Sequence, residues 1–187
     1  MKYKILTPPT VEPVTLAEAQ GHLRTLSDTV ENATITALIT AAREYCELYT
    51  RRALAPQTIE AYLDYFPGCH IDLPMPPLVS VTSIKYTDYA GAETTMPAAD
   101  YIVDTDSAPG RIVLPYGHMW PIFTPYTSNP IKVTYVAGYT TAPKAIKQAM
   151  LLLIGHWYSS REAVGDVGTP IAFAVSALLS MYKAGFF

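Results

Sequence analysis

Residues 42–63, AREYCELYTRRALAPQTIEAYL, contain the point at which one kind of secondary structure gives way to another. Before Pro56, apolar residues recur every three or four positions, which is the spacing of one face of an α-helix. After it, residues 58–63 follow the period of two that a half-buried β-strand requires. Proline lacks a backbone N–H and disfavours helix in the residue before it, so the boundary is sharp. The chain is predicted to change from helix to sheet at this proline.

A long amphipathic helix is predicted upstream of this boundary. The charged residues Arg43, Glu44 and Glu47 are expected largely on a different face from the apolar ones. The apolar positions follow helical spacing and are Ile35, Leu38, Ile39, Ala42, Cys46 and Tyr49.

A shorter helix is predicted nearer the N-terminus. Residues 7–14 hold three prolines and are expected to form an extended lead-in. Thr15 then offers an N-cap, and Glu18 completes a capping box, in which each side chain bonds the other residue's backbone N–H. The helix is expected to run to about Arg24.

Downstream of Pro56 the composition turns to Thr, Val, Ile and Tyr, which favour strands. Turn signals at 88–91 and 107–110, with proline-rich joints at 74–77 and 121–130, keep these strands short. The joint at 121–130 is a long loop for a compact domain, and such loops are usually functional or mobile. The predicted strands are 58–63, 80–87, 93–96, 101–104, 111–114 and 131–139.

Helical spacing returns in the last part of the chain. Pro143 suits a first helical position, and the apolar run that follows to Trp157 is typical of a helix surrounded by protein. A last helix is predicted from Ile171 to about Tyr182. Two helices, a β block and two more helices predict an α+β fold, in which a four-helix core carries an inserted antiparallel β lobe.

This order also predicts how the chain is divided. Residues 1–56 are expected to supply an N-terminal arm and the first two helices of the core. Residues 57–139 are expected to form the β lobe, and 140–187 the last two helices and a C-terminal arm.

Composition narrows the classes of protein to consider. The 187 residues include 13 basic and 16 acidic ones, and the net charge of −3 argues against a protein that coats nucleic acid. Cys46 lies on a helical pattern and Cys69 in a loop, so no disulfide is expected. The N-terminus reaches prolines before any apolar run of signal-peptide length. The apolar run at 149–157 is about half of the roughly 20 residues that cross a bilayer, so no membrane contact is predicted.

The histidines do not have the spacing of a compact metal site. Cys69, His70 and Asp72 come nearest to one. They fall at a strand-like edge, where a plain exposed loop explains them better than a bound metal. We therefore predict neither a metal nor a cofactor.

Two charged pairs invite a catalytic interpretation. Asp104 and Asp106 precede the turn at 107–110, and turn chemistry alone explains them. Arg161 and Glu162 follow the apolar helix, where a salt-bridged helix end or a subunit contact is favoured. The sequence contains neither a glycine-rich phosphate loop nor a nucleophile elbow. The chain is therefore predicted not to be an enzyme.

A set of strings recurs in a fixed order along nearly the whole chain. They are 6–9 (LTPP), 12–19 (EPVTLAEA) with 22–24 (HLR), the helix at 39–49 with 50–54 (TRRAL), 73–78 (LPMPPL) with 81–84 (VTSI), 135–139 (YVAGY), and 151–158 (LLLIGHWY) with 161–164 (REAV). In this order they resemble the head-tail connector proteins (adaptor, or head-completion proteins) of tailed bacteriophages. The ordered set is more specific than any one string.

The resemblance implies a structural subunit of a ring, commonly a dodecamer, that lies beneath the portal and joins the DNA-filled head to the tail. The implied partners are the portal protein, the next neck or tail protein such as a tail terminator or stopper, and duplex DNA that passes without specific binding. The implied location is the neck of the virion, and the host cytoplasm during assembly.

Interface residues are predicted on arms and loops, because a subunit of a closed ring makes contacts through two different faces. Exposed aromatic residues at such places often dock on a partner. The candidates are Trp120, Phe123, Tyr126, Arg161, Glu162, Tyr182, Phe186 and Phe187. For Phe186 and Phe187, folding back on their own helix is an equal alternative.

Two other functions stay open at this point. A tail terminator or another neck protein shares the ring symmetry, but tail terminators are mainly β, whereas this chain is predicted to have four helices. A small-ligand module built on the β lobe would need a concave pocket with convergent polar groups.

Overall fold

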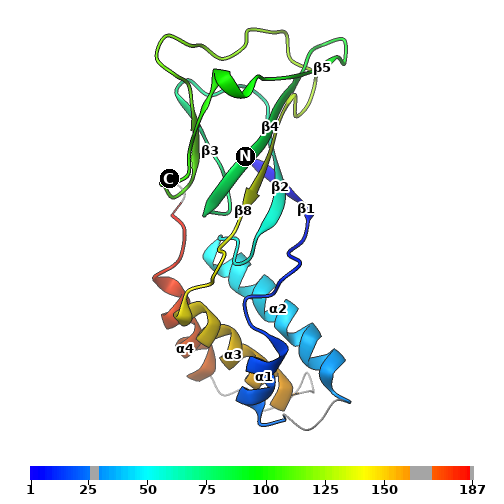
Figure 1. Cartoon of the computed structure of the whole chain (residues 1–187), viewed down its shortest axis with the longest axis vertical. Coiled ribbons are helices and arrows are strands. Elements are labelled where there is room, and N and C mark those ends of the chain that lie inside the picture. Colours follow the sequence, from blue (N-terminus) through cyan, green and yellow to red (C-terminus); the bar gives the residue numbers. More distant parts are fainter. Residues whose placement is uncertain (26–29, 161–169, 186–187) are drawn as a thin grey trace. The chain divides into compact units, whose positions relative to one another are not determined.

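The computed structural model describes residues 1–25, 30–160 and 170–185. It has a mixed α+β fold, as predicted, and divides into two compact units (Figure 1). The β unit comprises Met1–Thr10 and Pro56–Tyr139. The helical unit comprises Val11–Ala55 and Thr140–Gly185. Within the described ranges, no helix combines the length and the apolar character needed to cross a membrane.

The helical unit holds the predicted helices. They are α1 (Leu16–Leu23), α2 (Asn32–Thr50), α3 (Lys144–Ser159) and α4 (Pro170–Ser180). Helix α3 packs against both α2 and α4, and α1 packs against α2 and α3. Pro143 was predicted to be the first helical residue, and it is instead the N-cap of α3.

The capping box that was predicted at the start of α1 is confirmed. The Thr15 N–H donates to Glu18 Oε2 at 2.8 Å, and the Glu18 N–H donates to Thr15 Oγ1 at 3.2 Å. These bonds satisfy two N–H groups, one at the N-cap and one in the first turn of the helix. The helix ends at Arg24, whose left-handed backbone (φ 61°) turns the chain away from the helix axis.

Helices α2 and α3 each bury one face in the core. On α2 the buried apolar residues are Ile35, Ile39, Ala42 and Cys46, and on α3 they are Ile146, Ala149, Met150, Leu153 and Ile154. The prediction that protein surrounds α3 is wrong for the single chain, because Leu151 and Leu152 on its other side are partly exposed. Apolar residues all round a helix indicate that both of its sides can be buried. They do not identify whether the same chain or another protein covers the second side.

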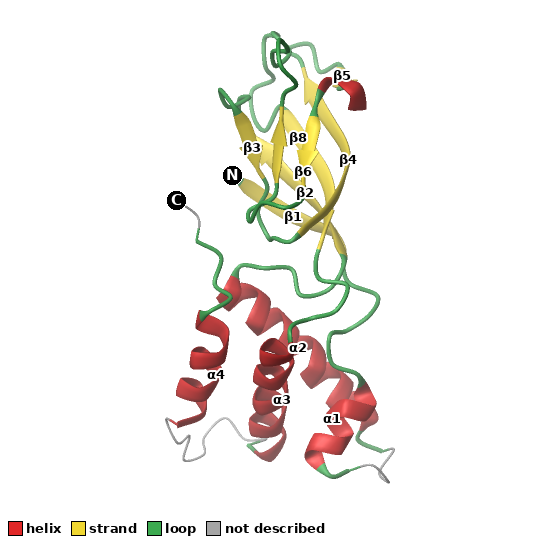
Figure 2. Cartoon of the chain, turned by 60° about the vertical axis from the view of Figure 1, so that its left-hand side comes forward, coloured by secondary structure: helices red, strands yellow, loops and turns green. Residues whose placement is uncertain are grey.

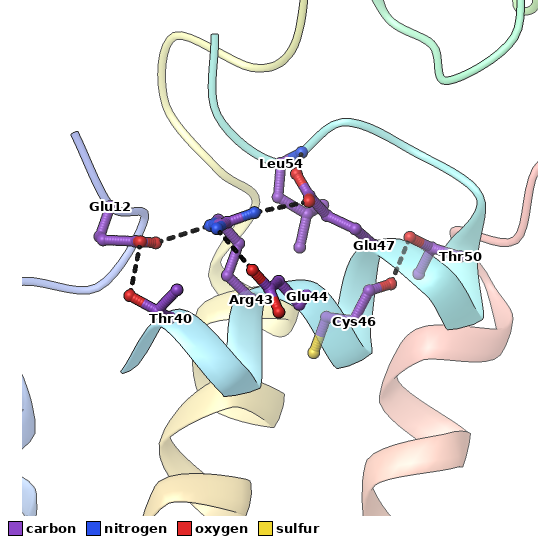
Figure 3. Close-up of polar contacts among 8 residues, drawn as sticks. All are labelled: Glu12, Thr40, Arg43, Glu44, Cys46, Glu47, Thr50 and Leu54. Atoms are coloured by element: carbon purple, nitrogen blue, oxygen red, sulfur yellow. Dashed lines mark hydrogen bonds and ion pairs between the residues drawn. The ribbon is translucent and has the colours of Figure 1, made fainter. Parts of the chain in front are cut away.

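The expectation that Arg43 and Glu47 lie away from the core is also wrong. Both residues are buried, whereas Glu44 is exposed. The Arg43 guanidinium donates from Nη1 to Glu47 Oε2 at 2.7 Å and from Nε to Glu12 Oε2 at 2.9 Å (Figure 3). Glu47 also accepts the Leu54 N–H at 2.8 Å. Burial of these charges is tolerated because each is paired and hydrogen-bonded.

This buried ion network fastens two chain segments to one helix. Glu12 belongs to the segment before α1, and Leu54 belongs to the segment after α2. The hydroxyl of Thr40 adds a second bond to the Glu12 carboxylate, at 3.0 Å. Helix α2 thereby holds both segments through Arg43 and Glu47. A division of the helix into a polar and an apolar face would place these two charged side chains in solvent.

The β unit contains two antiparallel sheets. The first has the strand order β1-β2-β8-β4-β5, and the second has the order β3-β7-β6. A short 3-10 helix, η1 (Ala98–Asp100), precedes β6. The strands are β1 (Lys2–Thr7), β2 (Gln57–Leu63), β3 (His70–Asp72), β4 (Leu78–Thr87), β5 (Glu93–Thr95), β6 (Ile102–Asp104), β7 (Arg111–Val113) and β8 (Ile131–Ala137).

All of the predicted strands are confirmed, with ends that differ by one or two residues. The central strand β8 buries every second residue, from Ile131 to Ala137, as its alternation requires. Strands β1 and β3 were not predicted. Strand β1 is exposed along its whole length, so it carries no alternating pattern, and β3 is only three residues long.

The two sheets of the β unit are linked where β4 begins. Gly110, just before β7, lies so close to Leu78 that a Cβ atom placed on it would come within 2.3 Å of the Leu78 Cβ. Nearby, the buried Tyr135 donates its hydroxyl to the Pro74 carbonyl at 2.7 Å. Close contact of this kind explains why a residue without a side chain occupies position 110.

Candidate functional site

The strand register brings three loops to one end of the β unit. Leu63, at the end of β2, pairs with Ile131 at the start of β8, and Tyr86 near the end of β4 pairs with the same Ile131. The connections beyond these residues therefore leave the sheet at one edge, where Figure 2 shows green loops gathered. We call segments 64–69, 86–92 and 115–130 the aromatic tip.

Four aromatic rings form the base of the aromatic tip. Phe66 stacks on Trp120 with ring centroids 4.9 Å apart and planes at 4°. Phe123 contacts Phe66 edge-on at 6.0 Å and Tyr86 at 5.0 Å. Aromatic pairs in these geometries add about 0.5–1.5 kcal/mol each beyond the burial of their area. The rings come from all three segments, so they hold the loops together.

Backbone hydrogen bonds add to this support. The Tyr89 N–H donates to the Thr124 carbonyl at 3.0 Å, and the Tyr126 N–H donates to the Thr87 carbonyl at 3.1 Å. The Asn129 N–H donates to the Asp64 carboxylate at 3.2 Å. The long loop that was predicted from its prolines is therefore fastened to two other segments over its second half.

The aromatic tip exposes several large apolar side chains. Ile122, for example, is 93% exposed, although it lies between Trp120 and Phe123 of the ring cluster in the sequence. The stretch 112–131 contains no Asp, Glu, Lys or Arg. An exposed apolar surface on fastened loops is typical of a site that docks on another protein. The large exposed residues are Tyr65, Tyr89, Tyr116, Met119, Ile122 and Tyr126.

The aromatic tip brings together three of the predicted interface residues. Trp120 and Phe123 are half-buried and belong to the supporting ring cluster, whereas Tyr126 is exposed. The Trp120 Nε1 is buried and has no hydrogen-bond partner among the described residues. Stacking, and not a hydrogen bond, therefore holds this indole in place.

The other predicted interface residues belong elsewhere. Tyr182 is half-buried in the helical unit, and its carbonyl accepts a hydrogen bond from Arg52 Nε at 2.6 Å. The Ala184 N–H donates to the Thr50 carbonyl at 2.8 Å, so this segment is tied to the end of α2. Arg161, Glu162, Phe186 and Phe187 lie outside the described residues.

Sequence reasoning missed half of the aromatic tip. Phe66 and Tyr86 complete the ring cluster, and Tyr65, Tyr89 and Tyr116 enlarge the exposed surface. Two signals were present in the sequence: the 14 tyrosines, and the uncharged stretch 112–131. Neither signal identifies which loops meet, because that depends on strand pairing.

The residues considered as catalytic or metal-binding candidates have structural explanations. The Asp104 carboxylate accepts the N–H groups of Asp106 and Ser107, both at 3.1 Å, as its turn role predicts. Hydrogen bonds from the Ser107 hydroxyl and from Arg111 lower the pKa of this carboxyl to about 2. The His70 imidazole lies 3.3 Å from the Asp72 carboxylate. Across the described ranges, no three His, Cys, Asp or Glu side chains are grouped so that they could hold a metal ion.

The helical unit buries two titratable side chains next to each other, Glu47 of the ion network and Cys46. Burial raises the pKa of the Glu47 carboxyl, while the Leu54 N–H and Arg43 lower it. Burial, with the nearby Glu47 charge, raises the pKa of the Cys46 thiol to about 12. A thiol with that pKa is protonated and unreactive at neutral pH.

The chain was compared with protein families and with solved structures. The family model described as "Head completion protein" matches residues 15–174. A chain in the neck of an empty GTA particle, computed with C6 symmetry, is 26% identical with a TM-score of 0.83, and the alignment covers 100% of this chain and 97% of that one. No curated protein matches the chain.

Two further structures are similar over the same lengths, 100% of this chain and 97% of theirs. One is a chain in the virion of a native gene transfer agent (GTA) particle, with a TM-score of 0.81 and 25% identity. The other is a chain in the neck of a native GTA particle computed with C12 symmetry, with a TM-score of 0.73 and 25% identity. Since the family model matches residues 15–174, well over half of the sequence, the chain belongs to the head completion protein family.

Proposed function

We propose that the chain is a structural head-tail connector (adaptor) subunit of a tailed bacteriophage or phage-like particle. It forms a ring beneath the portal and joins the DNA-filled head to the tail. The observation that carries this proposal is the likeness, over 100% of the chain, to chains in GTA necks, together with membership of the head completion family. The role needs surfaces for binding and no catalytic step.

The ring is proposed to be a dodecamer. The neck of a native GTA particle was computed with C12 symmetry, which supports this copy number, and that of an empty particle was computed with C6 symmetry, which twelve copies also satisfy. The net charge of −3 suits a ring whose channel lets duplex DNA pass without binding it tightly.

The division of labour in the subunit follows from its two units. We propose that the four helices form the core of the ring body and that residues 57–139 are a lobe inserted between the helices of that core. The inserted lobe carries the aromatic tip. Its partner is a neighbouring protein of the neck, either the portal protein or the next neck or tail protein.

A charged residue on the aromatic tip tests this docking role. Ile122→Lys places a charge on an exposed apolar position, so folding is unaffected while an apolar contact is lost. We expect at least tenfold weaker binding to the portal protein or the tail-side neck protein encoded in the same genome. Calorimetry or surface plasmon resonance measures this change.

The matched control is Val79→Lys. Val79 is also exposed and apolar, but it lies near the start of β4, far along the strand from Tyr86. We expect Val79→Lys to bind like the wild type. If Ile122→Lys and Val79→Lys bind the portal protein and the tail-side neck protein equally well, the aromatic tip is not the docking site. That result would not affect the proposed ring, which is tested separately by measuring assembly.

A further inference from the structure

The outward side of α4 is apolar, and its side chains from Phe173 onward stay exposed among the residues that the structure describes. The helix has the sequence PIAFAVSALLS, which contains no charged residue. Val175 and Leu179 are buried, whereas Phe173 is 77% exposed and Met181, which follows the helix, is 76% exposed. A surface helix of a protein that works alone carries polar residues on its outer face. We call Phe173, Ala174, Ala177 and Met181 the α4 face.

The polar groups on α4 do not prevent its burial. The Ser176 hydroxyl donates to the Phe173 carbonyl at 3.0 Å, and the Ser180 hydroxyl donates to the Ala177 carbonyl at 3.0 Å. Both hydroxyl protons are thus satisfied within the helix. Removing water from the α4 face leaves no hydroxyl donor unpaired, so the face can be covered at low cost.

A second apolar face lies on α2. Ala37, Ala41, Tyr45 and Leu48 are exposed and follow one another at helical spacing, so they share one side of the helix. Leu48 is 80% exposed. The alanines lack bulk and allow another helix to approach closely. We call these four residues the α2 face.

The two faces suit the geometry of a ring. A ring requires heterologous contacts, in which one face of a subunit meets a different face of the next. Within the helical unit, α4 and α1 lie on opposite sides of α3 in both views (Figures 1 and 2). Helix α4 is therefore at one flank of the helical unit, and the residues of the α4 face are exposed there.

We propose that the α4 face of one subunit packs on the α2 face of a second copy, and that this contact joins neighbours in the ring. The inference rests on the proposed function, since a ring supplies a second copy at a fixed place. The two faces lie on different helices and match each other in their apolar side chains, which stay exposed among the described residues. The exposed Glu44 borders the α2 face, and Tyr45 also contacts the Trp157 ring edge-on.

Assembly of charged variants is the first test. The α4 variant combines Phe173→Glu with Met181→Glu, the α2 variant is Leu48→Glu, and Val79→Lys, an exposed apolar position of the β unit outside the aromatic tip, is the control. Analytical ultracentrifugation is run over a range of concentrations, alone and with the portal protein. We expect the concentration at which half the chains are assembled to rise at least a hundredfold for both face variants. The control should assemble like the wild type.

Cross-linking between copies is the second test, and it reports the contact directly. The double variant Leu48→Cys with Phe173→Cys is made in a Cys69→Ser background, because Cys69 is the exposed natural cysteine and Cys46 is buried. A short bismaleimide should produce a ladder of oligomers that extends beyond the dimer. Each single-cysteine variant should give no ladder.

The outcomes separate this inference from the proposed function. Face variants that form rings of wild-type size, or a double-cysteine chain that gives no ladder in an assembled ring, would overturn the α4–α2 contact alone. A wild-type chain that stays monomeric both alone and with the portal protein would overturn the contact and the ring together. If a glutamate variant is unfolded by circular dichroism, the serine variants at the same positions replace it, with the same expected direction.

Discussion

Arg43 is the positive charge at the centre of the buried ion network of the helical unit. Its side chain is 5% exposed, and it contacts the carboxylates of Glu12, Glu44 and Glu47. Only Glu44, at 67% exposed, can exchange this contact for water freely. Removing Arg43 would leave the other two carboxylates without their positive partner.

Replacing Arg43 with Met is therefore expected to destabilise the protein by about 3–5 kcal/mol, the cost of breaking a buried ion pair from one side. Glu44→Gln is the control and should cost less than about 1 kcal/mol, because the lost pair is exposed and long. Urea unfolding followed by circular dichroism measures both. If Arg43→Met is as stable as Glu44→Gln, the ion network does not contribute to the free energy of unfolding as proposed.

Asp104 gives a prediction about pH. Hydrogen bonds from Ser107 and Arg111 hold its pKa at about 2 in the folded chain, below the ordinary value of 3.8. A carboxyl whose pKa is lowered by folding stabilises the fold above its unfolded pKa and loses that contribution as pH falls towards the folded one.

The stability difference between the wild type and Asp104→Asn should thus be constant from about pH 7 to pH 5 and shrink below about pH 4. Urea unfolding at a series of pH values measures this difference. The side chain of Asp104 is partly exposed, so solvent screening keeps the effect small. A difference that grows as the pH falls would refute the assignment of the lowered pKa.

At the scale of elements, Gly110 joins the two sheets of the β unit. A methyl group at this position would collide with the Leu78 side chain, whereas one at Gly68 would meet nothing within 4 Å. We expect Gly110→Ala to lower the free energy of unfolding by about 1–3 kcal/mol, as overpacking does. Gly68→Ala should change it by less than about 0.5 kcal/mol. Thermal unfolding of the two alanine variants decides the matter, and equal melting temperatures would count against this packing.

Elements with strong local signals were predictable. The capping box of Thr15, the helical spacing of α2 and the alternation of β8 each follow from physical chemistry that acts within a few residues. Strand β1 was not predictable, because it is held by backbone pairing to β2 with every residue exposed. Its assignment depends on a partner strand more than fifty residues away along the chain.

The errors on α2 have the same origin. Arg43 and Glu47 have the spacing of a solvated face, but segments before α1 and after α2 return to cover them. The aromatic tip was half predicted for a similar reason. The loop with Trp120 and Phe123 stood out by its composition, whereas Phe66 joins it only through the register of β2 with β8.

At the scale of the whole molecule, the two proposed contacts use different units. The aromatic tip belongs to the β unit, and the α4 and α2 faces belong to the helical unit. Variants of one should therefore leave the other intact, so Ile122→Lys should form rings that fail to dock. A glutamate on the α4 face should give monomers whose aromatic tip remains folded.

The central claim is that this chain forms a ring on the portal. The most direct test is to determine the mass of the purified wild-type protein, and to image it by negative-stain electron microscopy, both alone and mixed with the portal protein encoded in the same genome. The account predicts rings, or portal-dependent stacking of about twelve copies at one end of the portal. A chain that remains monomeric and shows no binding to the portal at any concentration tested would contradict it.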